Sequence, residues 1–308
     1  MNDLDGKNSS HGAVVDRIPA QAYFVGSAVF HYLGPSFAVL LFARVPVAGV
    51  AWLRIVSAAL VFALWRRPWR PLLTAPARTR RLVVALGVVL AAMNYAFYQA
   101  IAALPLGTVA AIEFAGPIAL AVAGARTRRN LAALALAAVG VHLLTGIRLA
   151  GAPLAFAWAF ANAALFTLYI VLAHAVSRAD AATTPVDRLG ASMLVAAVAI
   201  SPLGLTEALP ALLDPVALGA GIAVGISSSV IPYVFDQLAM ARLPRATYAL
   251  FVALLPATAV LVGILVLRQW PTQAEWLGVG LVACGVALHR PAGAETRECN
   301  HAIRQPGP

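Results

Sequence analysis

The stretch YAFYQAIAALPLGTVAAIEFAGPIALAVAG, residues Tyr95 to Gly124, decides how the chain folds. Two apolar runs flank the short connector from Leu104 to Gly107, and the stretch contains a single charged residue, Glu113. A helix needs roughly 20 mainly apolar residues to cross a hydrocarbon layer of ~30 Å. The stretch therefore belongs to two antiparallel membrane helices, and it places a carboxyl group inside the second.

A second copy of this stretch follows at Tyr233 to Gly263, YVFDQLAMARLPRATYALFVALLPATAVLVG, if one residue near Arg242 is counted as an insertion. Both copies carry two aromatic residues before a glutamine, a Leu-Pro pair in the connector and a later proline. The matched pairs are Tyr95 with Tyr233, Phe97 with Phe235, Gln99 with Gln237, Leu104-Pro105 with Leu243-Pro244, Thr108 with Thr247, Pro117 with Pro256 and Gly124 with Gly263. The chain is therefore interpreted as two related halves.

Composition places both halves in a membrane. Of the 308 residues, 61% are hydrophobic and 11% are charged, whereas an ordinary soluble domain carries about 25% charged residues. Apolar runs of spanning length recur along almost the whole chain. We predict ten spans, at residues 21–43, 47–65, 82–103, 107–125, 131–147, 153–176, 189–208, 216–241, 246–267 and 275–289.

Each half contains five spans, and because five is odd the second half enters the membrane from the opposite face. The predicted fold is an all-α integral membrane protein with ten transmembrane helices in two inverted five-helix repeats. The repeats cover residues 21–147 and 153–289, and tails cover 1–20 and 290–308. Inverted repeats that meet near the midplane are a transporter architecture, because two similar halves allow two conformations open to opposite sides.

The basic residues are sorted by side, which accounts for the net charge of +10. One set of loops and tails holds eighteen Lys and Arg residues, the other set holds Arg44, Arg148 and Arg268, and Arg54 lies inside a span. By the positive-inside rule the basic side faces the cytoplasm. We therefore predict an inner-membrane, multi-pass protein with both termini in the cytoplasm, and we expect no nucleic-acid partner.

Other classes of protein have little support. The N-terminal tail carries three aspartates and lacks the basic start of a secretory signal peptide. The two cysteines, Cys284 and Cys299, imply no disulfide framework. Metal-ligand spacing, intramembrane-protease motifs and a phosphate-binding loop are absent from the sequence. No cofactor or metal is predicted, and an intramembrane enzyme is the least favoured function.

Glu113 and Asp236 are the acidic residues that fall well inside a predicted span. A charged side chain at the centre of a membrane helix costs on the order of 2.5 to 3.5 kcal/mol, so such a residue faces a partner or a cavity. Two structural alternatives stay open. Glu113 can form an ion pair with Arg54, and Asp236 can lie near the headgroups because Arg242 follows closely.

Prolines weaken the helices at the same level. Pro117 lacks an N–H group and leaves the carbonyl of Glu113 without its helical donor. Pro232 does the same to Ser228, and Pro256 to the residue four positions before it. Broken helices are tolerated at membrane depth where protein or water satisfies the exposed groups. The three prolines therefore favour a lined cavity.

Polar side chains occur on neighbouring spans at helical spacing, and they complete the predicted substrate and coupling site. They would surround a zwitterionic or hydrogen-bonding solute, although hydrogen bonds between helices and packing in the core are alternatives for each. With Glu113, Asp236 and the three prolines, the set is His31, Asn94, Tyr95, Tyr98, Gln99, Asn162, Tyr169, Ser228, Tyr233 and Gln237.

These motifs resemble a known family. The sequence MNYAFYQAIAALPLGTVAAIEFAGPIALAV is similar to spans 3 and 4 of the EamA branch of the drug/metabolite transporter superfamily, and within it to the threonine/homoserine exporter type. The most telling part is the connector followed by Glu113, an aromatic residue, a small residue and Gly116-Pro117. SSSVIPYVFDQLAMARLPRATY is similar to span 8. Leu255 departs from the exporter pattern, which tends to have an acid before the proline of span 9.

The resemblance implies an inner-membrane exporter with five spans in each half, driven by secondary energy such as proton exchange. The expected cargo is a small metabolite, most simply an amino acid or an analogue, moved by alternating access. Burial favours the protonated carboxyl, so Glu113 would load and release a proton, and in its ionised form would attract an ammonium group. Efflux of lipophilic cations or drugs is the alternative, since Tyr95, Tyr98 and Tyr233 also suit a cation. The expected partners are the substrate, the proton and the lipid bilayer, and a homodimer is left open.

Overall fold

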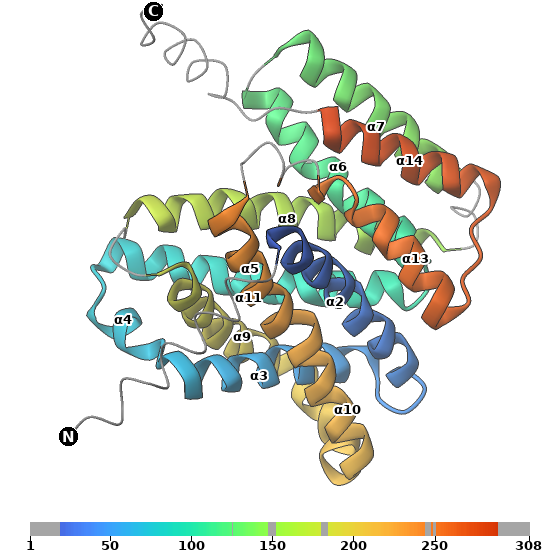
Figure 1. Ribbon diagram of the computed structural model, residues 1–308. Helices are drawn as coiled ribbons and strands as arrows, with labels where there is room; N and C mark the ends of the chain where they lie inside the picture. The colour runs from blue at the N-terminus through green and yellow to red at the C-terminus, as the bar shows by residue number, and fades with distance from the viewer. Residues whose placement is uncertain are drawn as a thin grey trace, which may run out of the picture.

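The computed structural model describes residues 19–124, 126–146, 152–179, 184–243, 248 and 251–288. In this part of the chain the regular structure is helical, without strands, as the sequence predicts (Figure 1). The helices are α2 (Ala20–Leu41), α3 (Val47–Arg66), α4 (Trp69–Thr74), α5 (Ala77–Ile101), α6 (Leu106–Gly124), α7 (Arg128–Gly146), α8 (Pro153–Ala179), α9 (Pro185–Leu213), α10 (Pro215–Gly225), the π-helical turn η1 (Ile226–Val230), α11 (Ile231–Arg242), α13 (Leu255–Leu267) and α14 (Gln273–Leu288).

Six helical segments are long and apolar enough to cross a membrane, judged by length and composition. They are Gln21–Leu41, Val47–Arg66, Ala77–Ile101, Pro153–Ala179, Pro185–Leu213 and Pro215–Asp236. Shorter apolar helices cover Leu106–Leu120, Leu255–Leu267 and Gln273–Leu288. Each predicted span thus contains a helix, but several of these helices are shorter than a full crossing.

Local sequence signals set the ends of the helices. The hydroxyl oxygen of Thr184 accepts a hydrogen bond from the N–H of Asp187 at 3.2 Å, and the carboxylate of Asp214 accepts one from the N–H of Val216 at 2.9 Å. A proline follows each of these capping residues, where its missing N–H leaves no bond unmade. These caps explain why α9 and α10 begin where they do.

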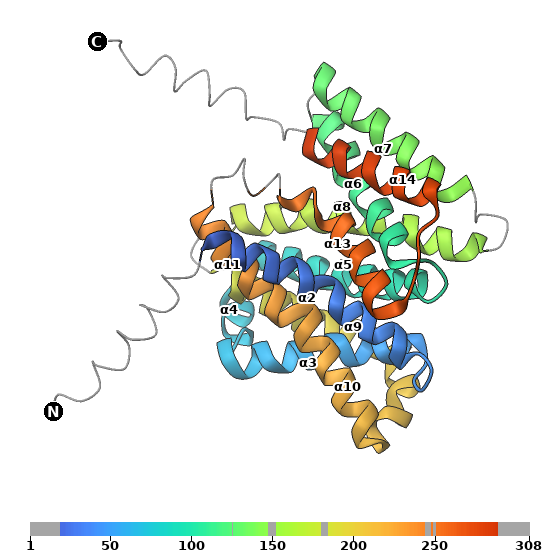
Figure 2. The same ribbon diagram turned by 45° about the vertical axis from the view of Figure 1, so that its right-hand side comes forward.

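Helices from the first part of the chain pack against helices from the second part in corresponding pairs. In the first half, α5 packs against α8 and α9, and α6 packs against α8. In the second half, α11 packs against α2, α10 and η1 pack against α2 and α3, and α13 packs against α2. Figure 2 shows α2 lying along α11 and α10. The pairs α3 with α9 and α7 with α14 complete the bundle.

The helix predicted at residues 216–241 has a break in its regular α-helical hydrogen bonding, although the chain stays helical throughout. α10, the π-helical turn η1 and α11 follow one another without a gap, so Pro232, the second residue of α11, lies inside a continuous helical segment. Pro117 lies inside α6, as predicted. Pro256 stands in the first turn of α13, directly after the turn residues Ala253 and Leu254, which separate α13 from the helical residues Phe251 and Val252. A proline is tolerated in a first turn, where its missing N–H would have no intrahelical partner.

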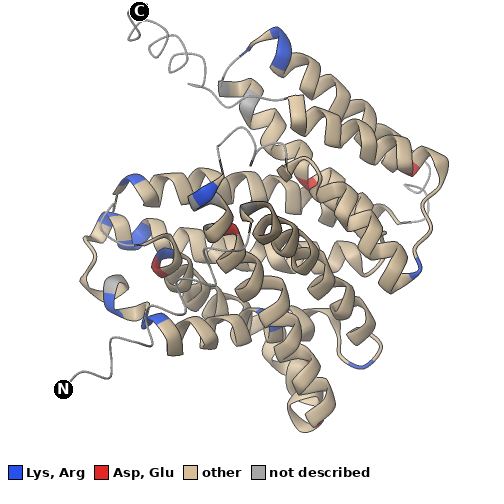
Figure 3. Ribbon diagram, viewed as in Figure 1, with Lys and Arg blue, Asp and Glu red and all other residues tan. Residues whose placement is uncertain are grey.

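Charged residues gather at the ends of the bundle (Figure 3). The end where α3 and α8 finish and α5 and α9 begin carries a group of arginines, namely Arg66, Arg67, Arg70, Arg78, Arg80, Arg81, Arg178 and Arg188. Among the described residues, the opposite end carries Arg44 and Arg268. These eight arginines belong to the group that the sequence assigns to the basic side, and Arg44 and Arg268 belong to the other group.

Candidate functional site

Arg54 lies in the middle of α3, and its side chain is buried against the broken helix. Its Nε donates a hydrogen bond to the hydroxyl oxygen of Ser229, and its Nη2 donates one to the carbonyl of Ser228, both at 3.3 Å. The guanidinium carbon lies 5.3 Å from the ring centre of Tyr98. Because Pro232 removes the helical donor of the Ser228 carbonyl, Arg54 supplies a replacement.

Gly34 allows α2 to approach this break. A Cβ atom at Gly34 would overlap the side chain of Ser228 and lie 2.8 Å from its backbone nitrogen. Only a residue without a side chain therefore fits at this crossing. The close approach places α2, α3 and η1 around one polar centre, to which α2 contributes Tyr32 and His31. Their rings are in edge contact, with centres 5.2 Å apart.

Gly116 brings α6 against α8 in a similar way. A Cβ atom at Gly116 would overlap the hydroxyl of Thr167 and lie 2.7 Å from the carbonyl oxygen of Ala163. Glu113 stands one turn earlier on α6, and Asn162 stands beside Ala163 on α8. The packing of these two helices therefore brings the carboxyl group and the amide to the same level.

Glu113 is 8% exposed and has no ion-pair partner among the described residues. The described part of the chain has two ion pairs, Arg44 with Asp214 and Arg66 with Asp187, and both lie toward the ends of helices. Arg54 acts on Glu113 electrostatically, but its nitrogens lie more than 4.0 Å from the carboxylate oxygens. The alternative of a direct structural ion pair is therefore not realised in this conformation.

Several buried polar atoms around these charges have no hydrogen-bond partner within 3.5 Å. They are the hydroxyls of Tyr32, Tyr98 and Ser228 and both amide atoms of Asn162. Tyr98 still interacts with Arg54 and Ser228, and Asn162 with Glu113, but none of these contacts meets the geometry of a close hydrogen bond. Their residues are at most 1% exposed. Buried polar groups are nearly always paired, so a cluster of unpaired ones favours a bound molecule or water as the missing partner.

The predicted residues on α5 divide into different environments. Asn94 donates from Nδ2 to the carbonyl of Leu90 at 2.8 Å, so its amide serves its own helix. Tyr95 is half-buried with its ring at right angles to that of Trp158. Gln99 is also partly buried. Of the four predicted residues on this helix, Tyr98 is the one in contact with Arg54.

The predicted residues on α11 do not share one environment either. Asp236 faces Ser27 and Tyr248. Tyr233 connects the two regions, since it acts electrostatically with Arg54, Glu113 and Asp236. Tyr233 lines a cavity of ≈ 180 Å³ together with Tyr169. A π-helical turn contains more residues than an α-helical one, so η1 changes the four-residue spacing that would have aligned Asp236 with Ser228. The side chain of Gln237 lies outside the described residues.

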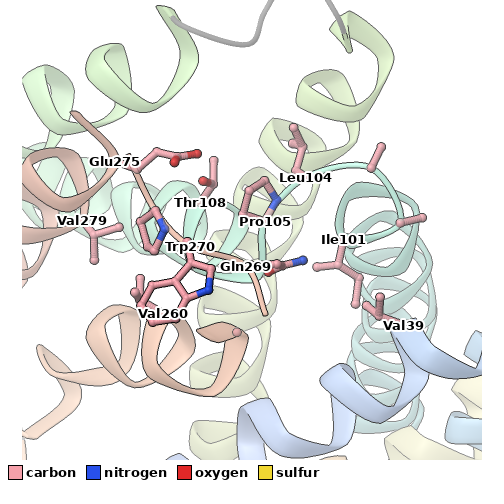
Figure 4. Close-up of a pocket in the computed structure, with 15 residues that line it drawn as sticks. Val39, Ile101, Leu104, Pro105, Thr108, Val260, Gln269, Trp270, Glu275 and Val279 are labelled. Atoms are coloured by element: carbon pink, nitrogen blue, oxygen red, sulfur yellow. The ribbon is translucent and has the colours of Figure 1, made fainter. Parts of the chain in front are cut away.

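A second cavity, of ≈ 310 Å³, lies at the opposite end of the bundle. The α5–α6 connection, the α13–α14 connection and the end of α2 line it. In Figure 4 the carboxylate of Glu275 is directed toward Thr108, while the ring of Trp270 covers another side of the cavity. The sequence alone gives no sign of this cavity, because the connections that line it lie far apart along the chain.

Arg54 is a candidate site residue that the structure adds to the predicted set. It entered only as a partner for Glu113, whereas the structure makes it the contact point of α3, α5 and η1. The signal was present in the sequence, since Arg54 is the basic residue inside a predicted span. Tyr32 is added by the structure as well, because no simple pattern separates it from a core tyrosine.

The apolar helices and the buried charged centre define the class as a multi-pass membrane protein. Comparisons with known proteins give the family. The model of the EamA-like transporter family matches residues 153–289. The threonine/homoserine exporter RhtA of Escherichia coli (strain K12) is 31% identical over 256 residues, covering 81% of this chain and 83% of that protein. RhtA of Salmonella typhimurium (strain LT2) is 31% identical over 253 residues, covering 80% and 82%.

A solved crystal structure has the same fold, with a TM-score of 0.55 at 19% identity, and the match covers 87% of this chain and 96% of that one. The chain belongs to the EamA-like transporter family of the drug/metabolite transporter superfamily. This confirms the family to which the sequence motifs pointed.

Proposed function

We propose that the protein is an inner-membrane exporter of a small amino acid or a close analogue, working by alternating access with Glu113 as the proton-coupling group. The observation that carries the proposal is a buried carboxyl without a cation within 4.0 Å, placed among unpaired polar groups. The sequence similarity to threonine/homoserine exporters supports the choice of cargo.

The packing of the helices supports two inverted repeats of five spans. In each half the third span packs against the first and second spans of the other half, and the fourth packs against the first span of the other half. Such exchange between halves is expected where the two repeats are related by an axis in the membrane plane. With the arginine-rich end in the cytoplasm, both termini also lie there.

The two cavities support alternating access. Thr108, in the lining of the larger cavity, precedes Glu113 by five residues on α6, which is about 7.5 Å along a helix. Tyr233, in the lining of the smaller cavity, follows Ser228 by five residues. The polar centre thus lies between two hollows that start from opposite ends of the bundle. Closing one and enlarging the other would expose the centre to either side.

Glu113 suits the coupling role because both of its protonation states have a use. Ionised, it attracts an ammonium group through charge. Protonated, it is neutral, and a neutral group crosses between the two conformations without carrying a bare charge through an apolar interior. A proton taken up after the substrate leaves would therefore permit the return step.

Efflux of a lipophilic cation is the second candidate. It is favoured by the aromatic rings of Tyr98 and Tyr32 near a carboxyl group, since aromatic faces attract cations. The buried positive charge of Arg54 opposes it, because two like charges in a low-dielectric site repel. The amino-acid proposal accommodates Arg54 and is therefore preferred.

The test is export from a bacterial host that lacks its own amino-acid exporters. Cells that make the wild-type chain should survive toxic threonine or homoserine analogues, and cells with Glu113→Gln should not, although the variant is present in the membrane in equal amount. Glu207→Gln is the control, since Glu207 is exposed on α9. Full resistance with Glu113→Gln would refute the coupling role, and resistance to cationic dyes alone would favour the second candidate.

A further inference from the structure

Arg54 carries a buried charge that no carboxylate of the described residues contacts directly, although Glu113 acts on it from a longer distance. The residue Arg54 is 9% exposed. No carboxylate oxygen of the described residues lies within 4.0 Å of its guanidinium nitrogens. Its two hydrogen bonds go to neutral oxygens of Ser228 and Ser229. A buried charge without a counter-charge is unfavourable, so this position is expected to hold an anion for part of the working cycle.

The hydrogen-bonding capacity of Arg54 is also incompletely used. A guanidinium has five N–H donors, and two of them are occupied here. The hydroxyl of Tyr98, whose ring lies under the guanidinium, and the hydroxyl of Ser228 have no partner within 3.5 Å. A carboxylate can accept hydrogen bonds from the remaining guanidinium N–H groups and from the two hydroxyl groups. Arginine often binds a carboxylate through two parallel hydrogen bonds.

The separation of Arg54 and Glu113 adds a second requirement. The two charges act on each other but are not in contact, and Tyr32 and Asn162 add unpaired polar atoms to the same region. An opposite-charge pair held apart in this way matches a small molecule with an anionic and a cationic end. An α-amino acid carries both ends on adjacent carbon atoms.

We infer that Arg54 binds the substrate carboxylate, while Glu113 faces the ammonium group, so that the site selects zwitterions with a free carboxylate. This inference rests on the proposed function and names the substrate class of the same site. Arg54 also holds the break between η1 and α11, so binding of a carboxylate would compete for donors that stabilise the break. Substrate binding and the conformation of the broken helix are thereby linked.

The test is binding of three compounds to the full chain in lipid nanodiscs, each measured by calorimetry. L-threonine has both charged ends, L-threonine methyl ester lacks the carboxylate, and N-acetyl-L-threonine lacks the ammonium group. The proteins are wild type, Arg54→Gln, Arg54→Lys and the control Arg44→Gln. Arg44 is a suitable control because its side chain is 64% exposed and lies far from the centre. Size-exclusion chromatography and helix content check the fold of each variant.

The wild type should prefer threonine over its ester. Arg54→Gln should lower threonine affinity about 10-fold or more, since a charged hydrogen-bonding partner is lost, and leave affinity for the ester unchanged. The threonine affinity of Arg54→Lys should fall between those of wild type and Arg54→Gln, because lysine keeps the charge but lacks the paired N–H groups of the guanidinium. Arg44→Gln should match wild type. A purely structural role for Arg54 would change all compounds equally.

Unchanged threonine affinity and preference in folded Arg54→Gln, or a wild type without preference for a carboxylate, would overturn the inference. Arg54-dependent binding of threonine and N-acetylthreonine with equal affinity would support the carboxylate role while refuting a zwitterion-selective, amino-acid exporting site. The two proposals can therefore fail separately.

Discussion

Helix α5 and the irregular helix formed by α10, η1 and α11 contain the start of the two similar stretches of sequence, yet they differ at two positions that decide their local structure. When Tyr95 is aligned with Tyr233, Asn94 corresponds to Pro232, and Leu90 corresponds to Ser228. In α5 the Asn94 side chain donates to the Leu90 carbonyl and the helix continues. In the second half Pro232 cannot donate, the helix breaks, and Arg54 donates to the Ser228 carbonyl instead.

The comparison shows how similar halves give an asymmetric centre. Both buried charges of this centre, Arg54 and Glu113, come from the first half, while the second half contributes neutral hydroxyls and the Ser228 carbonyl that Arg54 binds. The residue that matches Glu113 in the second copy is Val252, which packs against apolar clusters. The first half therefore supplies charge, and the second half supplies backbone that can rearrange.

The largest effect should come from moving the acid between halves. Combining Glu113→Gln with Val252→Glu keeps one carboxyl in the membrane, but the new acid lies among apolar side chains. We expect export of amino-acid analogues to fall to background, as measured by uptake into inside-out vesicles. Export restored to wild-type rate would mean that the halves are interchangeable and that the asymmetry is unimportant.

The next effect concerns the break itself. Pro232→Ala returns a helical donor to the Ser228 carbonyl, so the free energy of unfolding should rise by up to about 3 kcal/mol. Transport should fall about 10-fold, because Arg54 then shares the Ser228 carbonyl with a backbone N–H group and the helix loses its irregular point. Asn94→Ala is the matched change in α5, expected to lower stability by about 1 kcal/mol and to leave transport intact. Equal effects of both variants on transport would contradict the comparison.

A smaller effect is expected at the crossing of α2 with η1. Gly34→Ala should destabilise the protein by about 1–3 kcal/mol, since its Cβ would overlap Ser228 and force the helices apart. Gly219→Ala, where nothing lies within 4 Å of a Cβ, should instead stabilise by about 0.5–1 kcal/mol. Thermal unfolding in detergent measures both. A loss at Gly219 as large as at Gly34 would show that the crossing is not tightly packed.

The smallest effect on stability should come from breaking the ion pair between Arg66, at the end of α3, and Asp187. Arg66 pairs with Asp187 at 2.8 Å near the surface, where both partners contact water. Asp187→Asn should lower the free energy of unfolding by about 0.2–1 kcal/mol, as for exposed ion pairs. Transport should not change. A loss of transport comparable to that of Pro232→Ala would show that this end of α3 also takes part in the conformational cycle.

Much of the site could be predicted from sequence, because intramembrane acids and prolines are rare and conspicuous. Glu113, Pro117 and Pro232 are proposed on this basis, and Ser228 is proposed because Pro232 leaves its carbonyl without a helical donor. The grouping was less accurate, since Asp236 turned out to face Tyr248 and Ser27. Four-residue spacing assumes a regular α-helix, and the π-helical turn violates that assumption.

The sequence by itself determined that the protein lies in a membrane, where its apolar helices lie along the chain, that its two parts are similar in sequence, and that one helix carries a buried acid. These follow from composition and local pattern, which act over one turn or one span. Only the tertiary structure decided which groups meet. Arg54 and Ser228 are separated by 174 residues, and their contact depends on how closely α2 and α3 pack against the break. Such close packing is set by the shapes of several helices together, and no local pattern contains it.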